Sequence, residues 1–286
     1  MLNVTQLLSE EVASRLGANF AVSFGGGDTG HLAVAVRASR DALDRIATSD
    51  ALYHNVEHTV YVTLVGLQIL LGKQILEGDV SREDWLNVVV ALSCHDIGYV
   101  RGVCRTDSAQ RVSTGLQNHT VRVVEGDSDA VLMPIHVDRG KRYVAEQYPQ
   151  ADALIDVALV QSCIERTRFP VPNDPIHLET ADYPGLVRGA DLIGQLSDPR
   201  YLHKLSAVFY EFEEIGFNAS TGYRRPGDLL ETYPAFFEKN VAPFIPESVH
   251  YLEQTKEGRE ILASLYRNLE NARNRACAPH ARAQAW

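Results

Sequence analysis

Residues 52–72 read LYHNVEHTVYVTLVGLQILLG, and this long apolar stretch decides the fold. It predicts a helix from Leu52 to Leu71, followed by Gly72. His54 and His58 lie four residues apart near its start. On a helix, side chains with this spacing leave the same face, so the stretch presents a pair of imidazoles.

Most of the remaining chain also favours helices. Ser81 offers a capping oxygen, with Asp84 three residues later, and predicts a helix that ends near Gly98. Residues 101–124 change to short polar and glycine-containing pieces, which indicate a long loop with room for a small β-hairpin. Further helices are expected near Val137 and at residues 152–166, 182–197 (capped by Asp182), 201–214 and 247–275. The pattern as a whole predicts an all-α fold.

The chain has 286 residues, enough to bury a sizeable core without disulfides or structural metals. No internal repeat or low-complexity linker divides it. We expect an N-terminal elaboration at residues 1–45, with a turn at Gly25-Gly26-Gly27. The main helical domain follows at 46–275, and a loose tail at 276–286.

Charge and cysteine content narrow the class of protein. The formal net charge of −10 argues against extended nucleic acid, since such binding needs Lys and Arg to neutralise phosphates. The four cysteines lack CxxC spacing, and no signal peptide or membrane-length apolar run is evident. We therefore expect free thiols, no membrane partner and a cytoplasmic location.

Residues with metal-binding chemistry occur at three separated places. His58 is the first, the adjacent pair His95-Asp96 the second, and Asp191 the third. Asp191 lies within an otherwise apolar predicted helix, where a carboxylate needs a cation or a hydrogen-bond network. Imidazole with carboxylate is a mixed ligand set suited to Mn²⁺, Fe²⁺, Zn²⁺ or Mg²⁺. A bound ion of this kind activates water and attracts phosphoryl oxygens.

The order His, His-Asp, Asp on separate predicted helices resembles the HD-domain superfamily of metal-dependent phosphohydrolases. The resemblance covers about residues 45–210. It is closest to the cyclic-nucleotide phosphodiesterase branch, in which a Tyr-His-Asn-x-x-His segment opens the site. It implies an HD-type helical bundle that binds one or two divalent ions (Mn, Mg, Fe, Ni or Zn). The implied metal ligands are His58, His95, Asp96 and Asp191, and Asp96 would bridge to a second ion.

The same resemblance makes His54 the general acid that protonates the leaving oxygen. Histidine titrates near neutral pH, and a neighbouring acid such as Glu57 or Asp96 would hold it protonated. His136, at a predicted helix start, is the candidate for a second metal or a phosphate contact; a polar helix start is the alternative. His119 and His177 are expected to be loop or surface residues.

Two features depart from the phosphodiesterase branch. No histidine follows His95-Asp96 closely, where the chain continues Ile97-Gly98-Tyr99, and no late glutamine beside a stacking aromatic is evident. Arg166 and Arg168, at the end of a predicted helix, could contact an anionic substrate or interact with the helix dipole. The aromatic stretch 233–237 could shape either a pocket or a dimer contact.

The leading functional hypothesis is a metal-dependent phosphohydrolase that cleaves a phosphomonoester or phosphodiester of a small nucleotide-like substrate. Metal-activated hydroxide would attack, with His54 as general acid. One alternative is an HD-type diiron oxygenase, which needs a further imidazole such as His136. Another is a non-catalytic nucleotide-sensing module. The expected partner is a small phosphorylated molecule, and a homo-oligomer is left open.

Overall fold

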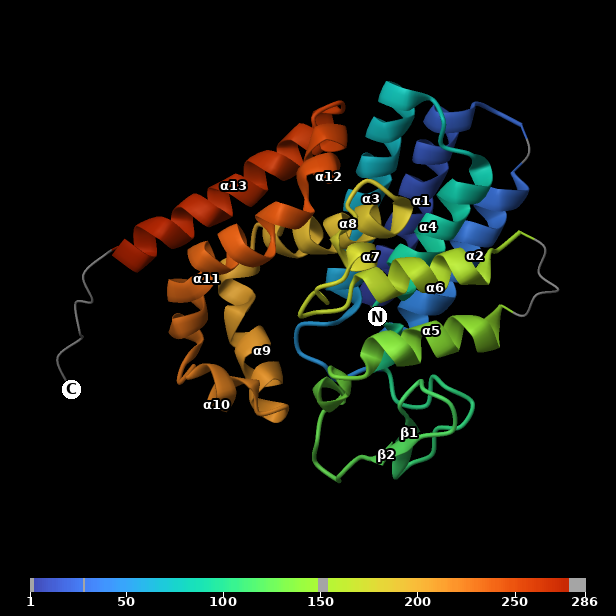
Figure 1. Ribbon diagram of the computed structural model, residues 1–286. Coiled ribbons are helices and arrows are strands. Elements are labelled where there is room, and N and C mark those ends of the chain that lie inside the picture. Colours follow the sequence, from blue (N-terminus) through green and yellow to red (C-terminus); the bar gives the residue numbers. More distant parts are fainter. Residues whose placement is uncertain (1–2, 28, 149–153, 278–286) are drawn as a thin grey trace.

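The computed structural model describes residues 3–27, 29–148 and 154–277 and is almost entirely helical (Figure 1). This confirms the predicted all-α class. The α-helices are α1 (Val4–Phe24), α2 (Gly30–Ile46), α3 (Val56–Glu77), α4 (Arg82–Cys94), α5 (His136–Gln147), α6 (Val157–Arg166), α7 (Pro175–Leu178), α8 (Tyr183–Ser197), α9 (Tyr201–Glu214), α10 (Phe217–Thr221), α11 (Pro226–Asn240), α12 (Pro246–Leu252) and α13 (Lys256–Cys277). Short 3₁₀ turns are η1 (Ile97–Tyr99), η2 (Asp129–Leu132) and η3 (Ala242–Phe244).

Helix α3 is the central element and packs against α1, α4, α8 and α12. It begins at Val56, four residues later than predicted, because the side chain of Asn55 caps the backbone N–H groups of Glu57 and His58. His54 therefore precedes the helix, and the expectation that His54 and His58 share one helical face was wrong. The helix is long and apolar enough to cross a membrane, but 67% of its most apolar window is buried inside the protein.

Gly72 does not end α3, which continues to Glu77 and stops at Gly78 in the left-handed conformation. A Cβ atom at Gly72 would lie 1.9 Å from the carbonyl oxygen of Tyr251. The glycine therefore marks a close contact between α3 and α12 and not a helix terminus.

Helix α4 starts at the predicted cap, where Ser81 accepts a hydrogen bond from the backbone N–H of Asp84. It ends at Cys94, earlier than the predicted Gly98. The chain turns at Asp96, whose φ of −102° and ψ of 6° leave the helical region, and then forms η1. This turn changes the directions of His95 and Asp96 from those of neighbours on a regular helix.

Helix α8 lies directly against α3. It begins as predicted, with Asp182 accepting from the N–H of Gly185 and Pro184 in the first turn. A Cβ atom at Gly194 would lie 2.9 Å from the Cα of Val62. The missing side chain at Gly194 thus allows the two backbones to approach, and this brings Asp191 beside the start of α3.

The predicted hairpin is present. Strands β1 (Arg111–Ser113) and β2 (Thr120–Arg122) pair antiparallel, with Val112 opposite Val121. Val112 packs in a small separate cluster with Val123 and Leu132. In Figure 1 the hairpin extends from the helical body below α5.

The N-terminal helices belong to the main core. Leu16 and Phe20 of α1 are buried in the same cluster as α3 and α4, and the ring of Phe20 lies 5.0 Å from that of Trp85. At the other end, helices α9, α10, α11 and α13 form a group to one side of α3 and α8 (Figure 1).

Two predicted helices have different bounds. The segment 247–275 is split into α12 and α13, because the hydroxyl of Thr255 accepts from the N–H of Gly258 and starts a new helix. The segment 152–166 begins at the cap Asp156, and residues 152–153 lie outside the described part. Of the predicted loose tail, the first two residues continue α13, and residues 278–286 also lie outside it.

Candidate metal centre

Three elements bring the predicted metal-binding side chains to one point. His58 comes from the first turn of α3, His95 and Asp96 from the turn after α4, and Asp191 from the middle of α8. The Nε2 atom of His58 lies 3.2 Å from Asp96 Oδ2, 3.4 Å from Asp191 Oδ1 and 3.3 Å from the Nε2 atom of His95. His95 Nε2 in turn lies 3.1 Å from Asp96 Oδ2 and 3.7 Å from Asp191 Oδ1.

These distances fit a shared metal ion. Ligand atoms bound at about 2.1 Å in a tetrahedral or octahedral arrangement lie about 3.0–3.4 Å from one another. His58, His95 and Asp191 each offer one atom within 4.8 Å of the others and could hold an ion. Asp96 Oδ2 is buried and makes no hydrogen bond of good geometry, although two imidazole nitrogens lie near it. An oxygen so placed is suited to a cation between these groups.

The local contacts also leave the metal-facing nitrogen of His95 available. Its Nδ1 atom lies 2.8 Å from the carbonyl oxygen of Leu92 and donates a hydrogen bond to it, so the lone pair of the neutral ring is on Nε2. Only 1% of this side chain is exposed, and water does not compete for the position.

Charge is concentrated in this buried cluster. Burial lowers the pKa of His95, but the carboxylates of Asp96 and Asp191 and the carbonyl oxygen of Leu92 together outweigh this effect and raise the pKa to about 9. Burial likewise disfavours ionised Asp96, yet His95 and His58 hold the pKa of its carboxyl well below its usual range. The two imidazoles thus favour ionised Asp96, and a bound divalent cation would do the same.

His54 lies at the edge of the cluster, with its ring centre 5.6 Å from that of His58. Its Nδ1 atom is 2.5 Å from Oε2 of Glu211, on α9, and the other oxygen of Glu211 accepts from the N–H groups of Tyr53 and His54. Burial lowers the pKa of His54, but Glu211, with a smaller contribution from Asp96, raises it above the usual value.

The sequence analysis did not identify Glu211 as the partner of His54. Of the two acids expected there, Asp96 does contribute to the raised pKa of His54, whereas Glu57 was wrong, because its carboxylate forms an ion pair with Lys204 at 3.0 Å. Glu211 is 157 residues from His54, and no local pattern connects them. Its side chain is only 1% exposed, so the carboxylate is enclosed together with the groups that it binds.

His136 opens α5 as predicted and joins the site from the opposite side. Its Nε2 atom lies 3.7 Å from Oδ1 of Asp96, the oxygen that faces away from His58 and His95. Its Nδ1 donates to the carbonyl oxygen of Met133, and burial lowers the pKa of the ring. The ring of Tyr99 stacks between His136 and His54, at 4.5 and 4.6 Å.

The two other histidines between His95 and Asp191 lie outside this cluster. His119 is exposed in the hairpin loop, as expected. His177 was expected on a loop surface, but it lies in the short helix α7 with its side chain only 13% exposed. Its Nδ1 atom is 2.7 Å from Asp174, and Glu165 lies 3.4 Å from its Nε2, so carboxylates on both sides hold the ring in place.

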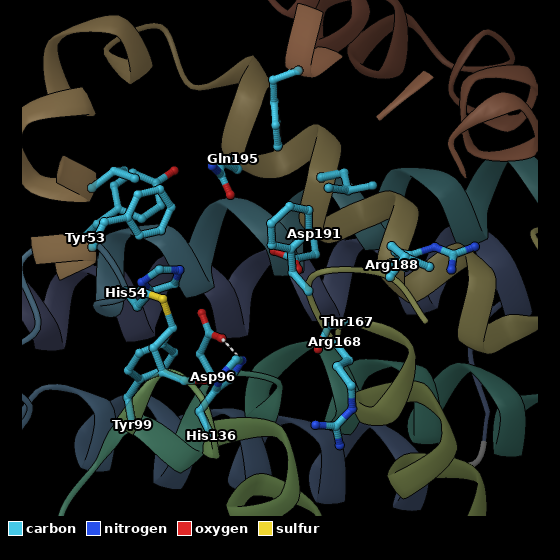
Figure 2. A pocket seen from close by; sticks show the side chains of 17 residues that line it. Tyr53, His54, Asp96, Tyr99, His136, Thr167, Arg168, Arg188, Asp191 and Gln195 are labelled. Carbon is cyan, nitrogen blue, oxygen red and sulfur yellow. Dashed lines mark hydrogen bonds and ion pairs between the residues drawn. The ribbon is translucent and has the colours of Figure 1, made fainter. Parts of the chain in front are cut away.

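The cluster opens into a cavity with an empty volume of about 850 Å³, open solvent at its mouth included. Figure 2 shows His54, Asp96, His136 and Asp191 directed into this metal cavity. Arg168 also lines it, but its guanidinium points away and pairs with Glu165 and Asp138. Arg166 is buried and bonded to Asp182. Neither predicted cation therefore offers a free charge at the metal cluster.

Comparison with known proteins gives a family for nearly the whole chain. A family model described as Npun_R2479-like matches residues 2–275. A search of curated proteins finds no match. The chain is thus a member of the Npun_R2479-like family.

Proposed function

We propose that the protein is a metal-dependent phosphohydrolase that cleaves a phosphomonoester or phosphodiester of a small organic molecule. The observation that carries the proposal is the placement of a carboxylate-bound imidazole, His54, in the cavity that Asp96 and Asp191 of the cluster also line. A metal site alone would fit many chemistries. A metal site beside a proton donor suits the hydrolysis of an ester, where a leaving oxygen needs a proton.

The cluster of His58, His95, Asp96 and Asp191 would hold the ion. When bound, a divalent ion supplies activated water and positive charge for the phosphoryl oxygens. The four groups come from α3, α8 and the turn after α4, and these elements pack into one common core that would support the ligands.

His54 would protonate the leaving group. Hydrolysis breaks the bond between phosphorus and the ester oxygen and forms a bond to the oxygen of water, and the departing oxygen takes up a proton. Glu211 occupies Nδ1 of His54, so Nε2 is the atom that can donate into the cavity. Glu211 also raises the pKa of His54 and keeps more of the ring protonated near neutral pH.

Elemental analysis combined with a screen of phosphate esters tests this proposal. Purified protein is expected to bind a divalent ion and to hydrolyse at least one ester class with Mn²⁺, Mg²⁺, Ni²⁺ or Zn²⁺ added. His54→Ala should lower turnover by about 100-fold or more while metal content stays near normal. Metal loss together with activity in this variant would contradict the role of His54.

A diiron oxygenase is the second candidate, favoured by His136 alone. Its Nε2 faces the second oxygen of Asp96, so a bridging carboxylate between two ions is geometrically reasonable. The two functions differ in a direct measurement. Protein purified with bound iron, a visible absorption band and oxygen uptake would favour the oxygenase, and colourless metal-loaded protein that cleaves esters would favour the hydrolase.

A further inference from the structure

A second cavity adjoins the metal cavity. It has an empty volume of about 860 Å³, open solvent included, and lies among α9, α11 and the loop before α7. We call it the aromatic chamber. The two cavities share five lining residues: Phe169, Gln195, Val208, Phe212 and Phe236. These shared side chains lie between the two cavities, so the chamber is the space that a group extending from the metal cavity past them would enter.

The chamber is built from uncharged groups. None of its fourteen described lining residues carries a charge, and most are aromatic or aliphatic. The rings of Tyr201 and Tyr233 lie 5.5 Å apart in a tilted arrangement, and Phe169 lies 6.0 Å from Phe236 across the junction of the cavities. Gln195 and Thr232 bond to the hydroxyls of Tyr201 and Tyr223, whereas the buried hydroxyl of Tyr233 has no hydrogen-bond partner among the described residues. Binding here would rest on apolar contact.

The charged residues of the metal cavity also bear on the kind of ligand that can bind across both cavities. Besides the histidines, its charged lining residues are Asp96, Asp191, Arg168 and Arg188. Arg168 is neutralised by two carboxylates, and Arg188 donates to the carbonyl oxygens of His177 and Glu179. Both guanidinium groups point away from the space between Asp96 and Asp191 in Figure 2. Among the described lining residues, neither arginine is directed at the space between Asp96 and Asp191.

We propose that the aromatic chamber receives an uncharged aryl or alkyl group of the substrate, so that the substrate has one anionic centre, at the metal, and an apolar organic group. This inference rests on the proposed phosphohydrolase function. It argues against polyphosphates as substrates, because a second anionic group in the chamber would lose its hydration without gaining a cationic partner.

The first test compares esters that differ only in the organic group. Full-length protein with added metal is assayed with methyl, phenyl and 2-naphthyl phosphate, and with AMP and ATP. We expect kcat/KM to rise about tenfold from phenyl to 2-naphthyl phosphate, whose leaving groups are similarly acidic, because more apolar surface is buried. Methyl phosphate and the nucleotides have more basic leaving groups and are compared through KM, which should be lowest for 2-naphthyl phosphate. Equal kcat/KM for the two aryl esters, or a lower KM for a nucleotide, would overturn the proposal.

A matched pair of variants locates the effect. Thr232→Trp places a large ring at the exposed rim of the chamber, whereas Ala235→Trp adds the same ring to α11 at an exposed position outside both cavities. Thr232→Trp should lower kcat/KM for 2-naphthyl phosphate about tenfold and leave methyl phosphate unchanged. Ala235→Trp should change neither. The same loss in both variants would contradict a role for the chamber.

The second test does not require hydrolysis. Binding of 2-naphthol to the full chain is measured by fluorescence in EDTA, so that neither metal nor phosphate contributes. Binding that is weakened by Thr232→Trp and not by Ala235→Trp supports the proposed role of the chamber. If the protein then cleaves no ester, only the proposed function fails. Active enzyme that binds no 2-naphthol would overturn the chamber and leave the proposed function in place.

Discussion

Replacement of Glu211 by glutamine tests the proton-donor role of His54 most directly. The substitution removes the negative charge and keeps the size and one carbonyl oxygen of the side chain. That oxygen can still accept from the N–H groups of Tyr53 and His54, which Glu211 Oε1 meets at 2.6 and 3.2 Å. Glu211→Ala would instead leave both buried donors without a partner and confuse catalysis with folding.

The magnitude follows from the lost charge. A hydrogen bond between charged groups contributes about 1.5–3 kcal/mol, which corresponds to roughly a 10- to 100-fold loss in the population of protonated His54. Glu211 raises the pKa of His54 against the effect of burial, so its neutralisation must lower that pKa. Activity that needs protonated His54 falls as the pH rises through this pKa. The falling limb should therefore move to lower pH in Glu211→Gln.

The assay is kcat against pH on the best ester, together with metal content and thermal unfolding. Glu214→Gln is the matched control, since Glu214 is exposed on the same helix and bonds only to Ser128 among the described residues. We expect kcat at pH 8 to fall about 10- to 100-fold in Glu211→Gln, with normal metal content. An unchanged pH limb in a folded, metal-loaded variant would refute the assigned role of Glu211.

Three further predictions concern the metal, the helix contact and the core. His58→Ala should weaken binding of Mn²⁺ or Zn²⁺ by about 100-fold or more in calorimetry, whereas the exposed His203→Ala should not. Gly194→Ala should lower the free energy of unfolding in urea by about 1–3 kcal/mol. Gly17→Ala is the control, because its added Cβ meets nothing within 4 Å; it should leave the free energy of unfolding unchanged or raise it by up to about 1 kcal/mol. Arg139→Met should cost about 3–5 kcal/mol in the same experiment, because it leaves a buried carboxylate unpaired.

Local sequence signals predicted many of the helices. Caps such as Ser81 and Asp182 act within three residues, and both start helices where the sequence predicts them. Asn55 is also a local cap, but the apolar pattern of residues 52–71 obscured it and placed the helix start too early. Other bounds were wrong where no cap was recognised, as at the end of α4 and at the break between α12 and α13.

Long-range neighbours could not be predicted in this way. Glu211 is one of three glutamates near the end of α9, and only its burial against Tyr53 and His54 distinguishes it. For the aromatic stretch 233–237, the sequence likewise did not decide between a role in a pocket and a role in a dimer contact. In the structure Tyr233 and Phe236 line the aromatic chamber, and Phe237 is buried in the core. Which residues of an amphipathic helix face a cavity depends on helices that the local sequence does not describe.

The cluster itself depends on backbones that approach more closely than side chains would allow. Gly194 lets α8 reach α3, which places Asp191 near His58. Gly98 has the same role on the other side, because its missing Cβ would lie 1.9 Å from the carbonyl oxygen of His136. The sequence shows which residues are His and Asp and hence their chemistry, but it does not show which atoms lie next to a glycine in the fold. The residues with metal-binding chemistry can thus be listed before the structure is known, whereas the residues that allow them to meet cannot.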